Sequence, residues 1–149
     1  MEIKIEPATI RFLEPFLKIE QQCFDQEAFT KQQIAYLLTD FHTIAFVAKV
    51  DGEIAGFIIA QVEIEENTEF GHIVTINVAP SFRRKKVATK MIHQLETALK
   101  QRSINQSRLE VREDNHAAIK LYQNIDYQTV GQLDRYYGKK HGLFLKKML

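Results

Sequence analysis

Apolar and polar positions alternate at the start of the chain and then recur at helical spacing. The alternation over Glu2 to Pro7 predicts a first strand. Between Thr9 and Phe24 the apolar residues fall every three to four positions, which predicts a helix. They are Ile10, Leu13, Phe16, Ile19 and Cys23. Thr30 can cap a second helix over Lys31 to Leu38.

Three segments rich in Ile, Val, Phe and Ala follow, over His42–Val50, Glu53–Glu63 and Glu69–Val78. Such composition favours strands. Asp51-Gly52 separates the first two and is a strong signal for a tight hairpin. We therefore expect the three segments to form an antiparallel meander.

The second half of the chain alternates helices and strands. A helix is predicted from Val87 to about Gln101, a strand over Ser107–Arg112, and a further helix capped by Asn115. Tyr127–Gln132 and Gly142–Met148 are the last two strands. Since we find no repeat, low-complexity segment or linker, the pattern predicts one α/β domain over residues 1–149.

Composition excludes several classes of protein. A net charge of +1 gives no reason to expect nucleic acid or an anionic membrane as a partner. The single cysteine, Cys23, excludes an internal disulfide and a cysteine-pair zinc site. We expect it to be a small buried residue, because no histidine or basic residue is near it in sequence. No apolar run could span a membrane, so we expect a cytoplasmic enzyme or binding domain without metal, as monomer or homodimer.

Four consecutive cations, Arg83 to Lys86, lie between a strand ending at Val78 and a helix beginning near Val87. The first N–H groups of a helix have no internal partners and carry the positive end of its dipole. The arrangement predicts a site for a phosphorylated ligand. The four cations alone are equally consistent with a solvated loop or a basic patch for nucleic acid.

The order V-x-P-x-x-R-R-x-x-V-A-x-x-M-I, from Val78 to Ile92, resembles the acetyl-CoA pyrophosphate loop of the GNAT superfamily of N-acetyltransferases. Arg83 and Ala88 match the ends of the family's R-x-x-G-x-G/A core, whereas Lys86 replaces a glycine. A positive φ at Lys86 would cost on the order of 1 kcal/mol. Either the loop keeps helical φ and the ammonium group reaches phosphate, or cofactor binding is weakened.

Leu109 to Tyr127 reads L-E-V-R-E-D-N-H-A-A-I-K-L-Y-Q-N-I-D-Y and resembles the second GNAT signature, with Asp126 in place of a glycine. The match is closest to the N-terminal peptide acetyltransferases, including those that modify ribosomal proteins. It implies the GNAT fold, a mixed central sheet of about seven strands with helices on both faces. It also implies that acetyl-CoA is held by Ile76, Asn77, Val78, Arg83, Arg84, Lys85, Lys86, Val87, Ala88, Thr89, Asn115 and Tyr122.

Acetyl transfer to an amine requires a neutral amine, a polarised carbonyl and a proton for the leaving thiolate. The resemblance implies that Glu110 is the base and that Tyr122 protonates the thiolate. His72 is a second candidate base, since imidazole titrates near neutral pH. The alternatives are a solvent-facing strand glutamate, a core tyrosine and a structural histidine, respectively.

Tyr136-Tyr137 resembles the paired tyrosines that hold the substrate in the peptide acetyltransferases, and Phe29 falls near an aromatic residue of the first substrate loop. The stretch 138–141, Gly-Lys-Lys-His, replaces an acidic one, and a cationic rim would favour acidic N-terminal peptides or an anionic small amine. The resemblance implies transfer to the α-amine of a peptide or protein N-terminus. A small-amine acetyltransferase is the alternative, as is a catalytically reduced acyl-CoA-binding domain, which Lys86 and Asp126 would explain.

Overall fold

The computed structural model describes residues 1–24, 26–138 and 140–149. In chain order the elements are β1 (Ile3–Pro7), α1 (Leu13–Cys23), α2 (Lys31–Thr39), β2 (Thr43–Val50), β3 (Glu53–Glu65), β4 (Thr68–Val78), α3 (Val87–Gln101), β5 (Gln106–Arg112), α4 (His116–Asn124), β6 (Gln128–Tyr137) and β7 (Lys140–Met148). Short 3-10 turns over Ile10–Phe12 and Pro80–Phe82 precede α1 and α3. The helix predicted from Thr9 is thus divided.

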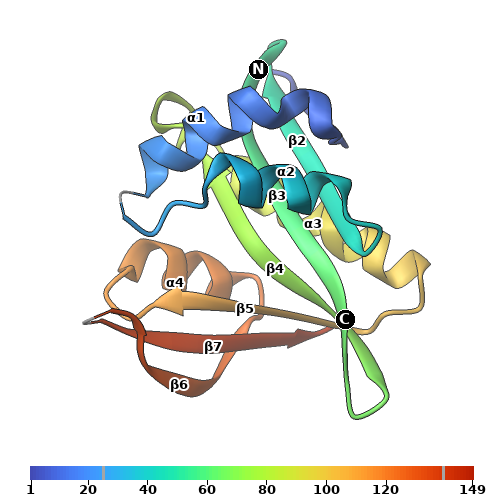
Figure 1. The fold of residues 1–149 in the computed structure, drawn as a ribbon, viewed down its shortest axis with the longest axis vertical. Helices are drawn as coiled ribbons and strands as arrows, with labels where there is room; N and C mark the ends of the chain where they lie inside the picture. The colour runs from blue at the N-terminus through green and yellow to red at the C-terminus, as the bar shows by residue number, and fades with distance from the viewer. Residues whose placement is uncertain (25, 139) are drawn as a thin grey trace.

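The strands of the described residues form one seven-stranded sheet in the order β1-β2-β3-β4-β5-β7-β6 (Figure 1). Neighbouring strands are antiparallel except β4 and β5, which run parallel. The predicted antiparallel meander of β2, β3 and β4 is confirmed, and so is the mixed sheet of seven strands.

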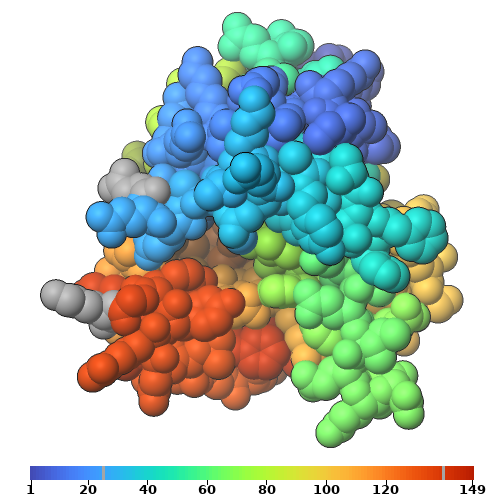
Figure 2. Space-filling model, viewed as in Figure 1, coloured from blue at the N-terminus to red at the C-terminus, as the bar shows by residue number. Residues whose placement is uncertain are grey.

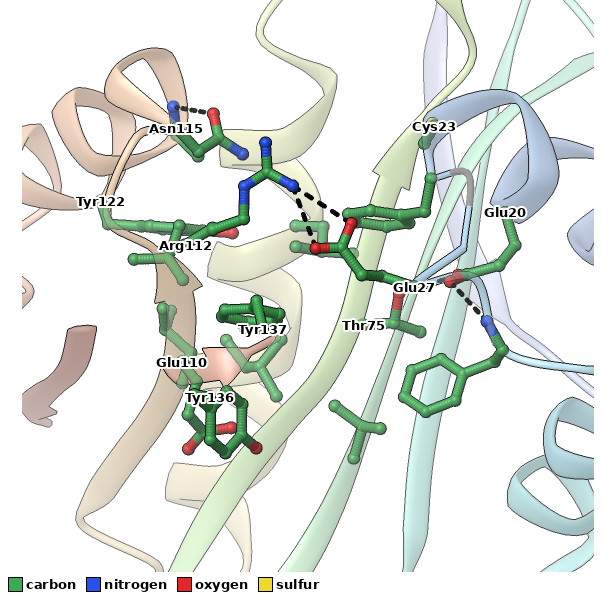
Figure 3. A pocket seen from close by; sticks show the side chains of 18 of the residues that line it. Glu20, Cys23, Glu27, Thr75, Glu110, Arg112, Asn115, Tyr122, Tyr136 and Tyr137 are labelled. Atoms are coloured by element: carbon green, nitrogen blue, oxygen red, sulfur yellow. Dashed lines mark hydrogen bonds and ion pairs between the residues drawn. The ribbon is translucent and has the colours of Figure 1, made fainter. Parts of the chain in front are cut away.

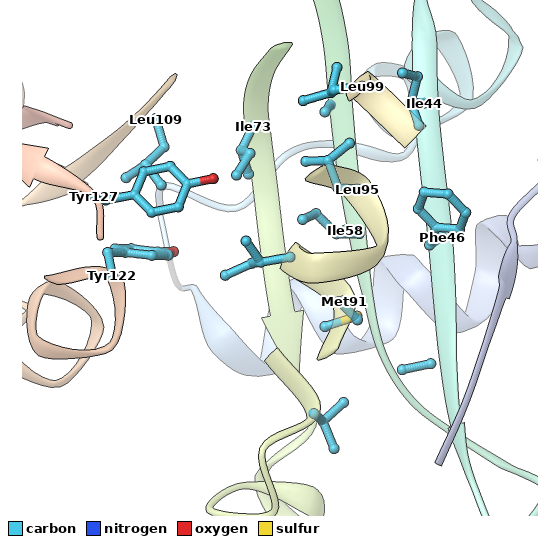
Figure 4. Close-up of a cluster of buried hydrophobic side chains, with 14 of the residues drawn as sticks. Ile44, Phe46, Ile58, Ile73, Met91, Leu95, Leu99, Leu109, Tyr122 and Tyr127 are labelled. Atoms are coloured by element: carbon cyan, nitrogen blue, oxygen red, sulfur yellow. The ribbon is translucent and has the colours of Figure 1, made fainter. Parts of the chain in front are cut away.

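Helices cover both faces of the sheet. Phe16 of α1 and Ile34 of α2 are fully buried, and the Phe16 ring stacks on Phe57 of β3 at 4.2 Å between centroids. On the opposite face, α3 turns a row of buried side chains toward the sheet (Figure 4). The row contains Val87, Met91, Leu95 and Leu99, the residues that share one face of the predicted helix. Burial of these two apolar layers is the main force that holds the helices on the sheet.

Local sequence signals explain where the elements begin and turn. Asp51 and Gly52 both have positive φ, 49° and 87°, as a tight two-residue hairpin turn requires. The Thr30 side chain accepts a hydrogen bond from the Gln33 N–H, and the Gln33 side chain accepts one from the Thr30 N–H, which forms a capping box. Asp126, just past α4, has φ 74° and occupies the left-handed position that the sequence predicted.

The two parallel strands separate after a short contact. β4 pairs with β5 only from Gly71 opposite Ser107 to Ile73 opposite Leu109. The register between β3 and β4 shifts at the same place, so that Val74 is bulged. Beyond these points the strands diverge and leave room between them.

Among the described residues, no helix combines the length and the apolarity that crossing a bilayer requires.

Candidate active site

A cavity of about 580 Å³ lies where β4 and β5 diverge. Figure 2 shows the surface hollowed between the N-terminal helices and the β6 and β7 strands. Side chains from α1, the loop after it, β4, β5, α4 and β6 form its wall (Figure 3). The predicted site residues on this wall are Phe29, Ile76, Glu110, Asn115, Tyr122, Tyr136 and Tyr137. Residues of six separate segments are thereby brought to one place.

Glu110 lies on the cavity wall and is hydrogen bonded to the second candidate base. Its Oε1 is 2.7 Å from His72 Nε2, and the other ring nitrogen of His72, Nδ1, is 2.6 Å from Glu63 Oε2. His72 itself is not on the cavity wall. The two bases that the sequence offered as alternatives are therefore in direct contact, and a second carboxylate lies behind them.

The two carboxylates determine the charge of His72. Burial alone would lower the pKa of its imidazole, but the hydrogen bonds and charges of Glu110 and Glu63 outweigh burial and raise it to about 8. Near pH 7 the ring is therefore mostly an imidazolium that donates to both glutamates. In that state His72 has no free ring nitrogen with which to accept a proton.

Tyr122 lies in α4 with its ring buried and its side chain on the cavity wall. Within the described residues its hydroxyl has no hydrogen-bond partner, and burial raises the pKa of this phenol above its usual value. Asn115 fixes the start of α4, because its Oδ1 accepts from the Ala118 N–H at 3.2 Å. The cap orients the helix so that Tyr122, two turns later, faces the cavity.

Two aromatic groups flank the entrance of the cavity. The Tyr136 and Tyr137 rings meet edge to face at 4.9 Å, at the end of β6 (Figure 3). The loop that carries Phe29 is held by Glu20, whose Oε2 accepts from the Phe29 N–H at 3.1 Å. Glu20 is 1% exposed, and its Oε1 also accepts from Thr75 and Asn77.

The basic loop begins at the open end of β4. Arg83 turns back on the strand, where its Nε donates to the Val78 carbonyl at 3.1 Å and its Nη2 to Cys23 Sγ at 3.4 Å. Cys23 is only partly buried, and the expectation that it has no basic neighbour is wrong, because Arg83 is distant in sequence but close in space. Burial raises the pKa of the Cys23 thiol more than Arg83 lowers it.

Lys86 immediately precedes α3 and has φ 63° and ψ 21°, in the left-handed region. The first alternative from the sequence, a loop that keeps helical φ at this position, is wrong. Arg84 has a positive φ as well, and Arg83 to Lys86 are all exposed. The loop is thus wound as a glycine-containing cradle would be, with a lysine in the glycine position.

The other residues predicted to hold the cofactor differ in how accessible the fold leaves them. Val87, the first residue of α3, is buried, whereas Ala88 and Thr89 are partly accessible. The Lys85 Nζ lies 5.8 Å from the centroid of the Phe82 ring. The Asn77 side chain does not reach the cavity wall, because its Nδ2 donates to Glu20 and Thr75. Beyond Ile73, the backbone N–H and C=O groups of β4 that face β5 are not paired with that strand.

Arg112 was not singled out from the sequence, although it ends the L-E-V-R motif. Its guanidinium donates to both oxygens of Asp114, at 2.6 and 3.1 Å, and to Glu27 at 3.0 and 3.3 Å. All three side chains are on the cavity wall. The pair with Asp114 could have been suspected from its spacing of two residues, but the contact with Glu27 has no sequence signal.

The described residues of the basic stretch 138–141 lie beside acidic groups at the edge of the site. The Lys140 ammonium lies 3.9 Å from the Asp114 carboxylate, and His141 Nδ1 accepts from the Arg135 N–H. Lys139 is outside the described residues. The described part of the chain also holds no group of three or more His, Cys, Asp or Glu side chains that could bind a metal ion.

Comparison with known proteins gives consistent matches. The model of the acetyltransferase (GNAT) family matches residues 10–127. An N-alpha-acetyltransferase of Sulfurisphaera tokodaii is 30% identical over 117 residues, which are 72% of this chain and 70% of that protein.

Two solved structures share the fold over nearly their whole length. The ribosomal-protein-S18-alanine N-acetyltransferase from Escherichia coli superimposes with a TM-score of 0.87 at 21% identity, covering 99% of this chain and 94% of that one. The NatC complex bound to Gag peptide and CoA gives a TM-score of 0.89 at 20% identity, covering 100% and 99%.

Proposed function

Because this chain belongs to the acetyltransferase (GNAT) family, we propose that it transfers acetyl from acetyl-CoA to the α-amine of a peptide or protein N-terminus. We take residues 1–149 as one acetyltransferase domain. The relatives support the reaction, since one is an N-alpha-acetyltransferase and one acts on a ribosomal-protein alanine. The lone Cys23 forms no disulfide, which fits a cytoplasmic location.

One observation carries the proposal. Glu110, Tyr122 and the Tyr136–Tyr137 pair, from β5, α4 and β6, line one cavity at the point where β4 and β5 part. A carboxylate, a phenol without a partner and an aromatic pair are what proton removal, proton delivery and substrate positioning require. The basic loop begins at the end of the strand that forms the opposite wall.

The chain offers a site that fits acetyl-CoA. The exposed cations Arg83 to Lys86 and the first N–H groups of the fifteen-residue helix α3 suit the phosphates. The unpaired backbone of β4 beyond Ile73, together with Asn115 and Tyr122 of the cavity wall, suits the arm that carries the acetyl group. When bound, acetyl-CoA supplies the thioester whose carbonyl carbon the amine attacks.

The side chains of the cavity have separate tasks. Glu110 accepts the proton of the amine, and His72 is hydrogen bonded to it from behind. Burial raises the pKa of Tyr122 and so keeps its hydroxyl protonated, and this hydroxyl donates a proton to the leaving sulfur. Phe29, Tyr136 and Tyr137 position the first residues of the peptide.

The state of the amine favours an N-terminus over a lysine side chain. At pH 7.4 an α-amine with a pKa of about 7.8 is roughly one quarter neutral, whereas a lysine amine with a pKa of about 10.4 is about 0.1% neutral. Because an α-amine is already partly neutral, it needs less help from a base than a lysine amine does. An α-amine is therefore the better substrate.

The test is to incubate the protein with acetyl-CoA and a peptide that has a free α-amine and an internal lysine. Mass spectrometry of fragments should place the acetyl group on residue 1. The same peptide with a blocked α-amine is the control and should remain unmodified. Acetyl found only on the lysine would indicate a side-chain enzyme instead. A second assay compares dipeptides with single small amines, and acetylation of the small amines alone would indicate a small-amine acetyltransferase.

A further inference from the structure

Resting on this proposed function for its catalytic part, we propose that Glu63 is a positioning residue of the same site. It holds the Nδ1–H of His72 and thereby presents Nε2 to Glu110, so that the three side chains take up the proton of the amine as one unit. Neither the sequence motifs nor the family resemblance pointed to Glu63.

The three side chains come from three adjacent strands and lie on one face of the sheet. His72 is opposite Gln61 on β3 and opposite Arg108 on β5. Glu63 and Glu110 each lie two residues beyond these partners, and side chains two residues apart in a strand point to the same face. The diagonal contacts on both sides of His72, at 2.6 and 2.7 Å, follow from this register.

The three side chains form a row that leads away from the cavity, from Glu110 through His72 to Glu63, and their exposed fraction increases along it. The side chain of Glu110 is 18% exposed, that of His72 is 22% exposed and that of Glu63 is 42% exposed. Glu110 touches the cavity, whereas His72 and Glu63 are not part of its wall. The row therefore connects the reacting amine to solvent without opening the cavity itself.

The surroundings of His72 are mainly acidic. Arg108, the cation opposite it, is committed to Gln106 and Glu65 and stacks on the Phe70 ring at 3.7 Å. Glu110 and Glu63 are the groups that keep the His72 ring protonated up to a pKa of about 8. Other charged or titratable groups near this site are Glu65, which pairs with Arg108, Asp40, which accepts from Gln61, and Tyr136, whose pKa is raised by burial and by the charges of Glu110 and Glu63.

The proton can be followed atom by atom. Once His72 is neutral, Glu63 retains the Nδ1–H and the Nε2 lone pair faces Glu110. The amine loses one proton to Glu110 as its bond to the acetyl carbon forms, and Glu110 passes that proton to Nε2. The imidazolium then releases its Nδ1 proton through Glu63 to water. Interacting groups titrate together, so the macroscopic pKa values of the base belong to the three side chains jointly and not to one residue.

The experiment compares wild type with Glu63→Gln, which removes the charge but keeps the shape. NMR titration of the His72 ring should give a pKa near 8 in wild type and a lower one, closer to the ordinary 6.5, in Glu63→Gln. Ring nitrogen shifts above pH 9 should show hydrogen on Nδ1 in wild type. Glu69→Gln is the matched control, because Glu69 is an exposed glutamate of β4 without a hydrogen bond or ion pair in the described part of the chain.

Kinetics supply the catalytic half of the test. With one peptide throughout, the acidic limb of kcat should move to lower pH in Glu63→Gln and the plateau should fall by about three- to tenfold. An unchanged His72 pKa in Glu63→Gln overturns the positioning role. A shifted pKa with an unmoved pH profile overturns the shared proton uptake.

Failure of the proposed function is distinguishable from failure of this inference. If wild type acetylates no peptide, the proposed function is wrong, while the NMR titration still decides whether Glu63 controls His72.

Discussion

The Arg112 guanidinium donates to the Glu27 carboxylate at 3.0 Å and thereby ties the loop after α1 to the end of β5, across 85 residues of chain. Both side chains are about one third to two fifths exposed, so solvent screens the pair and its contribution to the free energy of unfolding is small. The loop it restrains also carries Phe29, which we assign to the peptide.

We therefore expect Arg112→Gln to raise the KM for peptide about two- to fivefold while leaving the KM for acetyl-CoA near its wild-type value. Steady-state kinetics with each substrate varied in turn measures both. Glu27→Gln should have a similar effect, and the double variant should be no worse than either single one. Glu14→Gln, which removes an exposed carboxylate paired with Lys31 on the outer side of α1, is the control. Fully additive effects of the two substitutions would show that the ion pair is not responsible.

Lys86 combines a strained backbone with a charge, and two substitutions separate these effects. Lys86→Gly relieves the left-handed φ and should raise the free energy of unfolding by about 1 kcal/mol in urea titrations. Lys86→Ala keeps the strain and removes the charge, so the free energy of unfolding should change little. Both should weaken acetyl-CoA binding in calorimetry, more at low salt than at high salt. Tighter binding by Lys86→Gly would instead mean that the lysine obstructs the phosphate site.

Tyr122 and Tyr127 are a matched pair, because within the described residues the Tyr127 hydroxyl has hydrogen-bond partners and the Tyr122 hydroxyl has none. Tyr122→Phe should lower kcat by a factor of about 10² to 10⁴ without loss of stability. The Tyr127 hydroxyl donates to Glu96 Oε2 at 3.0 Å and is also hydrogen bonded to Ser107 Oγ at 2.8 Å in the core, so Tyr127→Phe should lower the unfolding free energy by about 1 kcal/mol and leave kcat almost unchanged. Unfolding curves and kcat values for both variants distinguish the catalytic role of Tyr122 from the structural role of Tyr127. An unaffected kcat in Tyr122→Phe would remove the phenol from the mechanism.

The raised pKa of His72 makes stability depend on pH. The folded pKa of about 8 exceeds the ordinary value of about 6.5, so the stabilisation is fully present below pH 6.5 and is lost as pH rises through 8. Its size is on the order of 2 kcal/mol. The difference in unfolding free energy between wild type and His72→Gln should thus be largest near pH 6 and smaller by about 2 kcal/mol at pH 9. A constant difference across this range would contradict the coupling to the two glutamates.

The predicted family and fold are confirmed by the family match and by the observed sheet. Signals that depend on neighbouring residues served well, since the Asp51-Gly52 turn and the Asn115 cap lie where the sequence predicted them. The motif around Glu110 and Tyr122 also led to two residues that share a cavity.

Contacts between distant strands escaped the sequence. Glu63 is one of several polar residues that alternate along β3, and only the register with β4 shows that it meets His72. Glu20 had a signal that was missed, since it falls on the same face of α1 as Phe16 and Ile19, where a charge has to find buried partners. Two of its three partners come from β4 and the third from the loop between α1 and α2.

The separation of β4 from β5 after three residue pairs bears on how such a chain can change its substrate. The opening is created by the path of the backbone, whereas the chemistry inside it is set by side chains that project from six separate segments. Exchanging one of these side chains alters what the cavity accepts without closing it. The amine specificity of such a cavity can therefore change by single substitutions, because none of them has to rebuild the sheet that creates the opening.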